Sequence, residues 1–271
     1  MDFKQGVRLG AYYPVKSPLH SMDARAKILA VLFFLLGIVW VDKFWAFGLV
    51  YAVGTALLCL ARVPVGRAFR AVRGLVFLLA VTCFINMFFS VGEQVLWQWG
   101  ILCLTAEGII KSLLMLLRLT ALTVFAGLLS FTTTPMELAD GMERLFTPFK
   151  RVGFPAHEFA MMMTIALRFI PIIMEEANKI IKAQRSRGGD FTAGRLTERL
   201  GGMVAVMVPL LYNALNRATD LAVAMEARAY SGGEGRVSLR EAVWRPADSV
   251  LLIGSLILLG VLIGSRYMGG I

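Results

Sequence analysis

The chain of 271 residues has few of the residue types that enzymes use for catalysis and metal binding. It holds three cysteines and two histidines. Cys59, Cys83 and Cys103 lie in apolar stretches without the Cys-x-x-Cys spacing of a metal site. The glycine-rich loop that binds nucleotide phosphates, Gly-x-x-x-x-Gly-Lys-Ser/Thr, is absent, and no serine, histidine and acidic residues form a recognisable catalytic set. We therefore expect no enzyme activity, no metal and no cofactor.

Charge is also scarce, and apolar residues dominate. Charged residues make up 17% of the chain and hydrophobic residues 58%, a composition typical of membrane proteins. The apolar runs are 29–61, broken by Asp42-Lys43, and 75–91, 109–131 and 250–264. Because about 20 apolar residues cross a bilayer core of roughly 30 Å, the first run is interpreted as a hairpin of two spans. The sequence predicts an all-α membrane protein with about five transmembrane helices.

We also expect no cleavable signal peptide, because the first 27 residues carry five basic residues and no apolar segment. The formal net charge is +10, and the basic residues concentrate at the amino terminus, in 62–73 and in 144–245. The connections at 42–43 and 93–107 carry almost none. Since basic loops stay on the cytoplasmic side, we expect the amino terminus and 144–245 to be cytoplasmic.

Two further stretches, 159–174 and 203–215, are apolar enough to suggest spans. If both crossed the bilayer, the basic segment 182–199 would face outside and Arg168 would lie within the membrane. We therefore interpret them as parts of two long, crossed cytoplasmic helices, with two true spans as the alternative. The predicted organisation is a membrane module of four spans at 1–131, a cytoplasmic or interfacial coupling module at 132–245, and a final transmembrane helix at 246–271.

The start of the expected coupling module carries a local helix signal. Thr134 suits the N-cap, Pro135 the first helical position and Glu137 the third, which together predict a capping box. Apolar residues then recur on one face: Leu138, Met142, Leu145 and Phe149. We expect an amphipathic helix at the membrane surface that ends at Pro148.

A six-residue pattern occurs twice, 41 positions apart. Ala183-Gln184-Arg185-Ser186-Arg187-Gly188 and Ala224-Met225-Glu226-Ala227-Arg228-Ala229 both have the form Ala-x-x-small-Arg-small. Each copy closes a helical stretch expected to begin near a proline, Pro171 or Pro209, and glycines that suit a helix end follow. An arginine between small residues can approach a partner's backbone and offer a rigid guanidinium fork. The repeat predicts two similar docking grooves on a partner.

Arg118 is the one charge expected inside a span, and we expect it to snorkel or to pair within the helix bundle. No intramembrane acidic cluster suggests an ion path. A membrane-embedded enzyme or ion channel remains an alternative that would require activity from this chain alone.

Several stretches together carry a family resemblance. They are Ser17-Pro18-Leu19-His20-Ser21-Met22-Asp23-Ala24-Arg25-Ala26-Lys27, the segments 130–135 and 166–171, and the two arginine motifs with the residues after them, 183–191 and 224–235. Over nearly its whole length the chain resembles the transmembrane T component of energy-coupling factor (ECF) transporters, in the subgroup shared by several vitamin-binding subunits.

The resemblance implies a division of labour in the bacterial plasma membrane. Two cytoplasmic ABC-type ATPases, expected to be a heterodimer, hydrolyse ATP, a membrane S component binds the vitamin, and the T component links them; no nucleic acid takes part. The family's Ala-Arg-Gly motifs end two coupling helices and insert into grooves of the ATPases. The implied ATPase-binding residues are Ser186, Arg187, Gly188, Ala227, Arg228 and Ala229. The alternative is the T component of a dedicated cobalt, nickel or biotin system.

This chain departs from the family motif at two positions. Serine replaces alanine at Ser186, and alanine replaces glycine at Ala229. Both remain small, so close approach to a partner is preserved. A required positive φ would be harder for Ala229 to adopt than for glycine.

Overall fold

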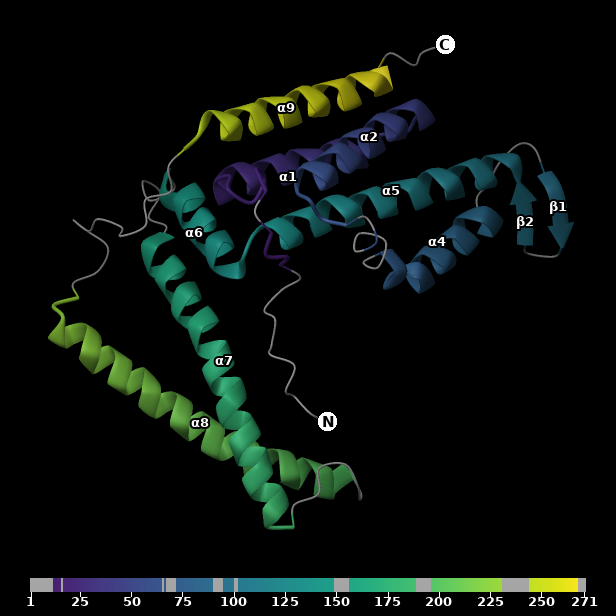
Figure 1. The fold of residues 1–271 in the computed structure, drawn as a ribbon. Coiled ribbons are helices and arrows are strands. Elements are labelled where there is room, and N and C mark those ends of the chain that lie inside the picture. The colour runs from purple at the N-terminus through teal and green to yellow at the C-terminus, as the bar shows by residue number, and fades with distance from the viewer. Residues whose placement is uncertain are drawn as a thin grey trace. The chain divides into compact units, whose positions relative to one another are not determined.

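The computed structural model describes residues 12–15, 17–64, 66, 72–89, 95–99, 102–148, 156–188, 196–230 and 244–267. Helices and one strand pair make up these residues (Figure 1): α1 Ala24–Val39, α2 Phe44–Leu60, α4 Val76–Phe89, β1 Val95–Trp99, β2 Leu102–Thr105, α5 Ala106–Thr132, α6 Pro135–Phe146, α7 Ala156–Ser186, α8 Leu196–Ala227 and α9 Pro246–Tyr267. The all-α prediction is confirmed, with the short antiparallel β1–β2 pair as an addition.

Contacts within the chain divide it into two compact units. One comprises Leu9–Gly141 with Ala242–Ile271, and the other comprises Met142–Glu241 with Met1–Arg8. This division reflects contacts between residues and not position in a membrane. The module boundaries 1–131, 132–245 and 246–271 therefore stay predictions.

Three helices among the described residues are long and apolar enough to cross a bilayer: Ala106–Thr132, His157–Ser186 and Pro246–Arg266. Two shorter apolar helices are Phe44–Leu60 and Val76–Phe88. The second of the three long helices is α7, which we interpreted from its basic surroundings as cytoplasmic. Length and composition alone admit α7 as a span, so its cytoplasmic placement stays a prediction.

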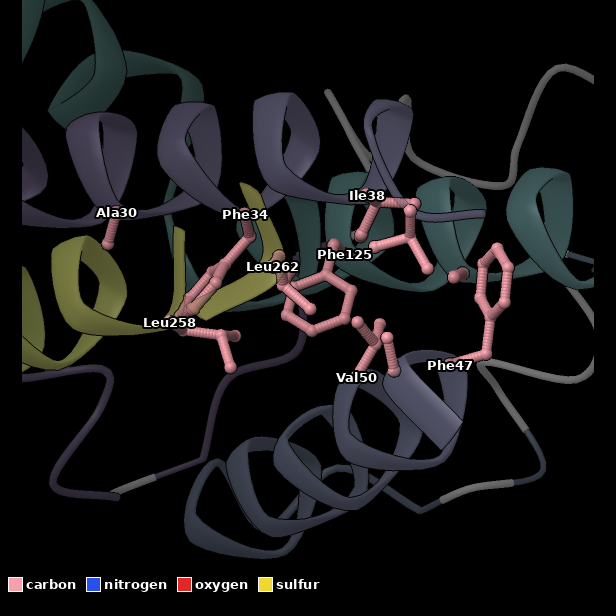
Figure 2. Packing of buried hydrophobic residues seen from close by; sticks show 11 residues of the cluster. Ala30, Phe34, Ile38, Phe47, Val50, Phe125, Leu258 and Leu262 are labelled. Carbon is pink, nitrogen blue, oxygen red and sulfur yellow. The ribbon is translucent and has the colours of Figure 1, made fainter. Parts of the chain in front are cut away.

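The core of the first unit is a bundle of α1, α2, α9 and the carboxyl-terminal half of α5. Aromatic and branched side chains from the four helices meet on its axis, and Phe34 of α1 lies against Phe125 of α5 with ring centroids 4.9 Å apart (Figure 2). Phe47 and Val50 of α2 and Leu262 of α9 complete this contact. Each such aromatic side chain removes a large apolar area from its surroundings, so these contacts fix how the helices pack.

The amino-terminal half of α5 packs against α4 instead. Ser112 Oγ donates to the carbonyl of Cys83 at 2.8 Å. A Cβ at Gly108 would lie 2.9 Å from the carbonyl oxygen of Met87, so only glycine permits this approach. The Thr105 side chain accepts from the Gly108 amide and caps the start of α5.

A buried lysine connects two helices at one end of the bundle. Lys27 Nζ donates to the carbonyls of His20 and Thr132, both at 3.2 Å, and so ties the start of α1 to the end of α5. His20 is itself held by Ser17 Oγ at 2.7 Å and by the carbonyl of Tyr13 at 3.0 Å. The motif that resembles the family's entry segment, residues 17–27, thus forms a hydrogen-bonded polar cluster where α1 begins and α5 ends.

Arg118 of α5 lies at the opposite end of the bundle. Its Nη2 donates to the carbonyl of Val41 at 2.6 Å and to Asp42 Oδ1 at 3.0 Å. Arg266 of α9 approaches the same carboxylate at 3.8 Å and stacks over the ring of Trp40. The expectation that Arg118 pairs within the bundle is confirmed.

Helix α6 begins as the sequence predicts. The Thr134 amide donates to Glu137 Oε2 at 3.1 Å, and the Glu137 amide donates to Thr134 Oγ1 at 3.2 Å, so the capping box is complete. The helix ends at Phe146, two residues before the predicted Pro148. Its buried residues are the small Ala139 and Gly141. The apolar residues Leu138, Met142 and Leu145 stay partly or fully exposed, and Phe149 lies outside the described residues.

Candidate docking site at two helix ends

Helices α7 and α8 carry the two arginine motifs. They comprise 31 and 32 residues, and Pro171 and Pro209 lie inside them. The expectation that each helix begins near its proline is wrong, because α7 begins at Ala156 and α8 at Leu196. A proline removes one amide donor and disturbs the preceding turn. It does not end these helices, since long runs of helical contacts continue on both sides.

The two helices cross (Figure 1), and polar side chains connect them. Glu176 of α7 accepts from Asn213 Nδ2 at 2.9 Å and from Arg217 Nη2 at 2.7 Å. Gln184 Nε2 of α7 donates to the carbonyl of Ala205 at 3.3 Å. The pairing of 176 with 213 and of 184 with 205 makes the helices antiparallel. Their carboxyl ends therefore lie on opposite sides of the Glu176–Asn213 contact, as two separate tips.

The first tip is a helix end with a left-handed residue. Gly188 has φ +84°, and its amide donates to the carbonyl of Arg185 at 3.0 Å. The Arg187 amide donates to the carbonyl of Gln184 at 3.1 Å. These bonds are one half of a Schellman motif, with Arg187 as the C-cap and Gly188 after it. The Ser186 hydroxyl donates to the carbonyl of Lys182 at 3.1 Å, so it is directed to its own helix.

The second tip repeats this geometry with alanine in place of glycine. Ala229 has φ +54°, and its amide donates to the carbonyl of Glu226 at 2.9 Å. The Tyr230 amide donates to the carbonyl of Met225 at 3.0 Å, which completes the Schellman motif. The left-handed conformation costs a residue with a Cβ about 1–2 kcal/mol, so Ala229 adopts it at a steric cost that Gly188 avoids.

The six predicted docking residues are all exposed: Ser186, Arg187, Gly188, Ala227, Arg228 and Ala229. Within the described part of the chain, no hydrogen bond or ion pair is made by the guanidinium of Arg187 or Arg228. Glu226 lies two residues before Arg228 and makes no ion pair with it. Each arginine is therefore presented at a fixed helix end with its fork available to an acceptor.

A broad apolar surface accompanies these tips on α7 and α8. Its most exposed members are on α8: Met207, Val208, Leu211, Tyr212 and Leu215, each at least 60% exposed. An apolar patch of this kind on a protein surface is covered by a membrane or by a partner. The helices thus combine an apolar side with charged tips.

The chain was compared with known protein families and with curated proteins. Residues 15–239 match the family described as CbiQ, cobalt transport protein. Three relatives share the description "Energy-coupling factor transporter transmembrane protein EcfT". The protein of Acidaminococcus fermentans is 43% identical over 90% of this chain and 91% of its own length. The protein of Thermanaerovibrio acidaminovorans is 44% identical over 99% of this chain and 100% of its own length. The protein of Listeria innocua is 39% identical over 95% of this chain and 97% of its own length.

The family match over residues 15–239 contains the segment 17–27, α7, α8 and both arginine tips. The three relatives match over at least 90% of this chain and at least 91% of their own length. The chain therefore belongs to the EcfT family of transmembrane components of energy-coupling factor transporters.

Proposed function

We propose that the chain is the coupling subunit of its transporter, linking ATP hydrolysis by two cytoplasmic ABC-type ATPases to vitamin or micronutrient uptake by a membrane S component. The observation that carries this proposal is the repeated helix end. Arg187 and Arg228 occupy the same C-cap position, each followed by a left-handed residue. Two similar local geometries at separate tips suit two homologous grooves on a pair of related ATPases.

The coupling is mechanical in this proposal. ATP binding draws the two ATPases together, and each carries one arginine tip with it. Because packed helices move as rigid bodies, displacement of the tips changes how α7 and α8 cross. The exposed apolar side of the two helices then changes its contact with the S component. In this arrangement the chain crosses the bacterial plasma membrane several times, and its amino terminus and both tips lie in the cytoplasm.

A second candidate is the T component of a dedicated metal or biotin system. The description of the matched family, cobalt transport protein, favours it. The relatives described as EcfT, which match over nearly the whole chain, favour the shared subunit. The two candidates differ in the number of S components that one T component serves.

Affinity purification of the tagged chain from its own membranes, with mass spectrometry of the bound subunits, tests the proposal. We expect two different ATPase subunits and several different S components in the shared system, and one S component in a dedicated system. The chain purified alone should neither hydrolyse ATP nor bind a vitamin in calorimetry. Recovery without any ATPase, or ATPase activity of the chain alone, would overturn the proposal.

A further inference from the structure

An apolar groove lies between α1, α2 and α9, within the first unit. Its volume is about 730 Å³, and its walls include Phe34 of α1, Leu49 and Leu57 of α2, and Val250 and Gly254 of α9. Ser255 is the one residue with a polar side chain in its lining, and its hydroxyl already donates to the carbonyl of Leu252. The groove therefore offers no free polar group to a polar solute.

The groove extends along α2 and α9. Its lining on α9 extends from Ala247 to Val261, about 21 Å at 1.5 Å per residue, and on α2 from Leu49 to Leu60, about 17 Å. One leaflet of a hydrocarbon core roughly 30 Å thick is about 15 Å deep, so the groove matches the depth of a leaflet. A transmembrane helix about 10 Å wide and 30 Å long occupies on the order of 2,400 Å³, so a whole helix would not fit inside a groove of about 730 Å³.

Basic residues flank one end of the groove. Arg62 follows the lining residue Leu60 by two positions, and Arg245 precedes the lining residue Ala247 by two. Both are exposed, and among the described residues neither guanidinium has an ion-pair partner. Trp244, beside Arg245, is 43% exposed, and tryptophan is enriched at membrane–water interfaces.

The backbone holds Arg62 at this end of the groove. Arg62 has φ +53°, and its amide donates to the carbonyl of Cys59 at 3.0 Å. The Val63 amide donates to the carbonyl of Leu58 at 3.2 Å, so α2 also ends in a Schellman motif. The acidic groups of this region are already engaged. Asp23 pairs with Arg25, and Asp248 is fully buried and accepts two backbone amides.

We propose that this groove binds one anionic phospholipid. An acyl chain fills the apolar groove along α2 and α9, and the phosphate lies between Arg62 and Arg245 at its basic end. The charge complementarity selects an anionic headgroup, because basic pockets between transmembrane helices on the cytoplasmic side attract negatively charged lipids. The bound lipid fills the space between α2 and α9, which contact each other little, and so supports the bundle from its open side.

Native mass spectrometry of the full chain in mild detergent tests the proposal. Phosphatidylglycerol and phosphatidylcholine with the same acyl chains, and inorganic phosphate, are titrated separately. We expect one phosphatidylglycerol molecule to bind saturably, phosphatidylcholine to bind more weakly, and inorganic phosphate not to be retained. Arg62→Asn and Arg245→Gln should each weaken phosphatidylglycerol binding about fivefold, since one basic residue near a membrane surface contributes about 1 kcal/mol. Asparagine tolerates the left-handed conformation, so Arg62→Asn keeps the helix end.

Matched variants on α9 separate the groove from the rest of the surface. Gly254 lines the groove and Gly260 does not, and both have open space where a Cβ would lie. Gly254→Leu should abolish binding of both lipids, and Gly260→Leu should leave it unchanged. Lys111→Gln, a charge removed from exposed surface on α5, controls for net charge. Ile257→Trp, a change at a groove residue that is 61% exposed, replaces Gly254→Leu if the latter does not fold.

Three outcomes would overturn the proposal. They are equal binding of the two lipids, unchanged phosphatidylglycerol binding in both arginine variants, and unchanged binding in both groove variants. The proposal would also be overturned if a second copy of the chain occupied the groove. That outcome would be seen as a dimer that dissociates in the Gly254→Leu variant.

Discussion

The backbone amide of Asp23 donates to Asp248 Oδ1 at 2.9 Å, across 225 positions of the sequence. Asp23 is the N-cap of α1, and Asp248 lies in the first turn of α9. The second oxygen of Asp248 accepts the Arg245 amide at 2.8 Å. One buried carboxylate thus serves the amino-terminal ends of two helices, where negative charge is favourable.

Asp248→Ala should destabilise the chain by about 2–6 kcal/mol, because two amides lose their acceptor and each buried unpaired donor costs about 1–3 kcal/mol. Asp248→Asn should cost less, since its one carbonyl oxygen can still accept one amide. Thermal unfolding in detergent measures the difference. Asp220→Ala, at an exposed position of α8, is the control and should change stability by less than about 0.5 kcal/mol. Equal losses of stability in Asp220→Ala and Asp248→Ala would contradict the role of Asp248 as acceptor for two helix ends.

The left-handed residues at the two tips should respond to mutation with opposite signs. Ala229→Gly relieves a steric cost of about 1–2 kcal/mol, so it should slow hydrogen exchange at the end of α8. Gly188→Ala introduces the same cost and should speed exchange at the end of α7. Gly201→Ala is the control, because Gly201 lies within α8 with open space around it, and there alanine favours the helix by about 0.5–1 kcal/mol. Faster exchange in Ala229→Gly would show that the backbone at Ala229 is not strained.

Arg187→Ala and Arg228→Ala should each weaken retention of the ATPases. Loss of a guanidinium buried in the interface leaves the partner's acceptors unpaired, which lowers the binding free energy by about 2–5 kcal/mol. Lysine should rescue poorly, because an ammonium cannot make two parallel hydrogen bonds. The two losses should be unequal, because Ser186 and Gly188 flank one arginine and Ala227 and Ala229 the other. ATPase retention and vitamin uptake are measured in membranes with each single variant and the double variant.

The control for these arginine variants lies on the same helix. Arg185 is exposed in the last turn of α7, two residues from Arg187, and is outside the small-Arg-small triplet. Arg185→Ala should retain assembly and uptake. Normal assembly and uptake in both Arg187→Ala and Arg228→Ala would show that these arginines are only solvated charges at helix ends.

Cysteine labelling should place both tips in the cytoplasm. In a background without Cys59, Cys83 and Cys103, single cysteines at positions 190 and 233 should resist a membrane-impermeant thiol reagent in intact cells. A cysteine at position 93 should react, because the connection 93–107 carries almost no basic residues and is therefore expected to face outside. Labelling at 190 with protection at 233 would instead show that α7 and α8 both cross the bilayer.

The sequence could predict those features whose partners are close in the chain. The capping box joins Thr134 and Glu137, three positions apart, and the helix end at Gly188 depends on one glycine and the turn before it. Their residue types reveal them because the bonds close within one turn. The position of an arginine tip on α8 could likewise be predicted, although only the structure shows that Ala229 adopts the positive φ.

The long-range contacts could not be predicted in the same way. Arg118 is evident as a charge in an apolar helix, but nothing local shows that its partner is Asp42, 76 positions away. Asp248 carries no sequence signal beyond its place in a first turn. The rule that helices start at proline also failed for Pro171 and Pro209, because tertiary contacts of long helices outweigh the loss of one amide donor.

Pro209 has a further consequence, because it has no amide to donate to the carbonyl of Ala205, four positions earlier. That carbonyl accepts Gln184 Nε2, three positions before Arg187. The second motif has Met225 at the place of Gln184, and a methionine cannot donate such a bond. The first tip is thereby joined by a hydrogen bond to the turn of α8 that precedes its proline, and the second tip has no equivalent donor. If a ligand at the first tip alters this hydrogen bond, reciprocal linkage requires the conformation of α8 near Pro209 to alter the affinity of that tip.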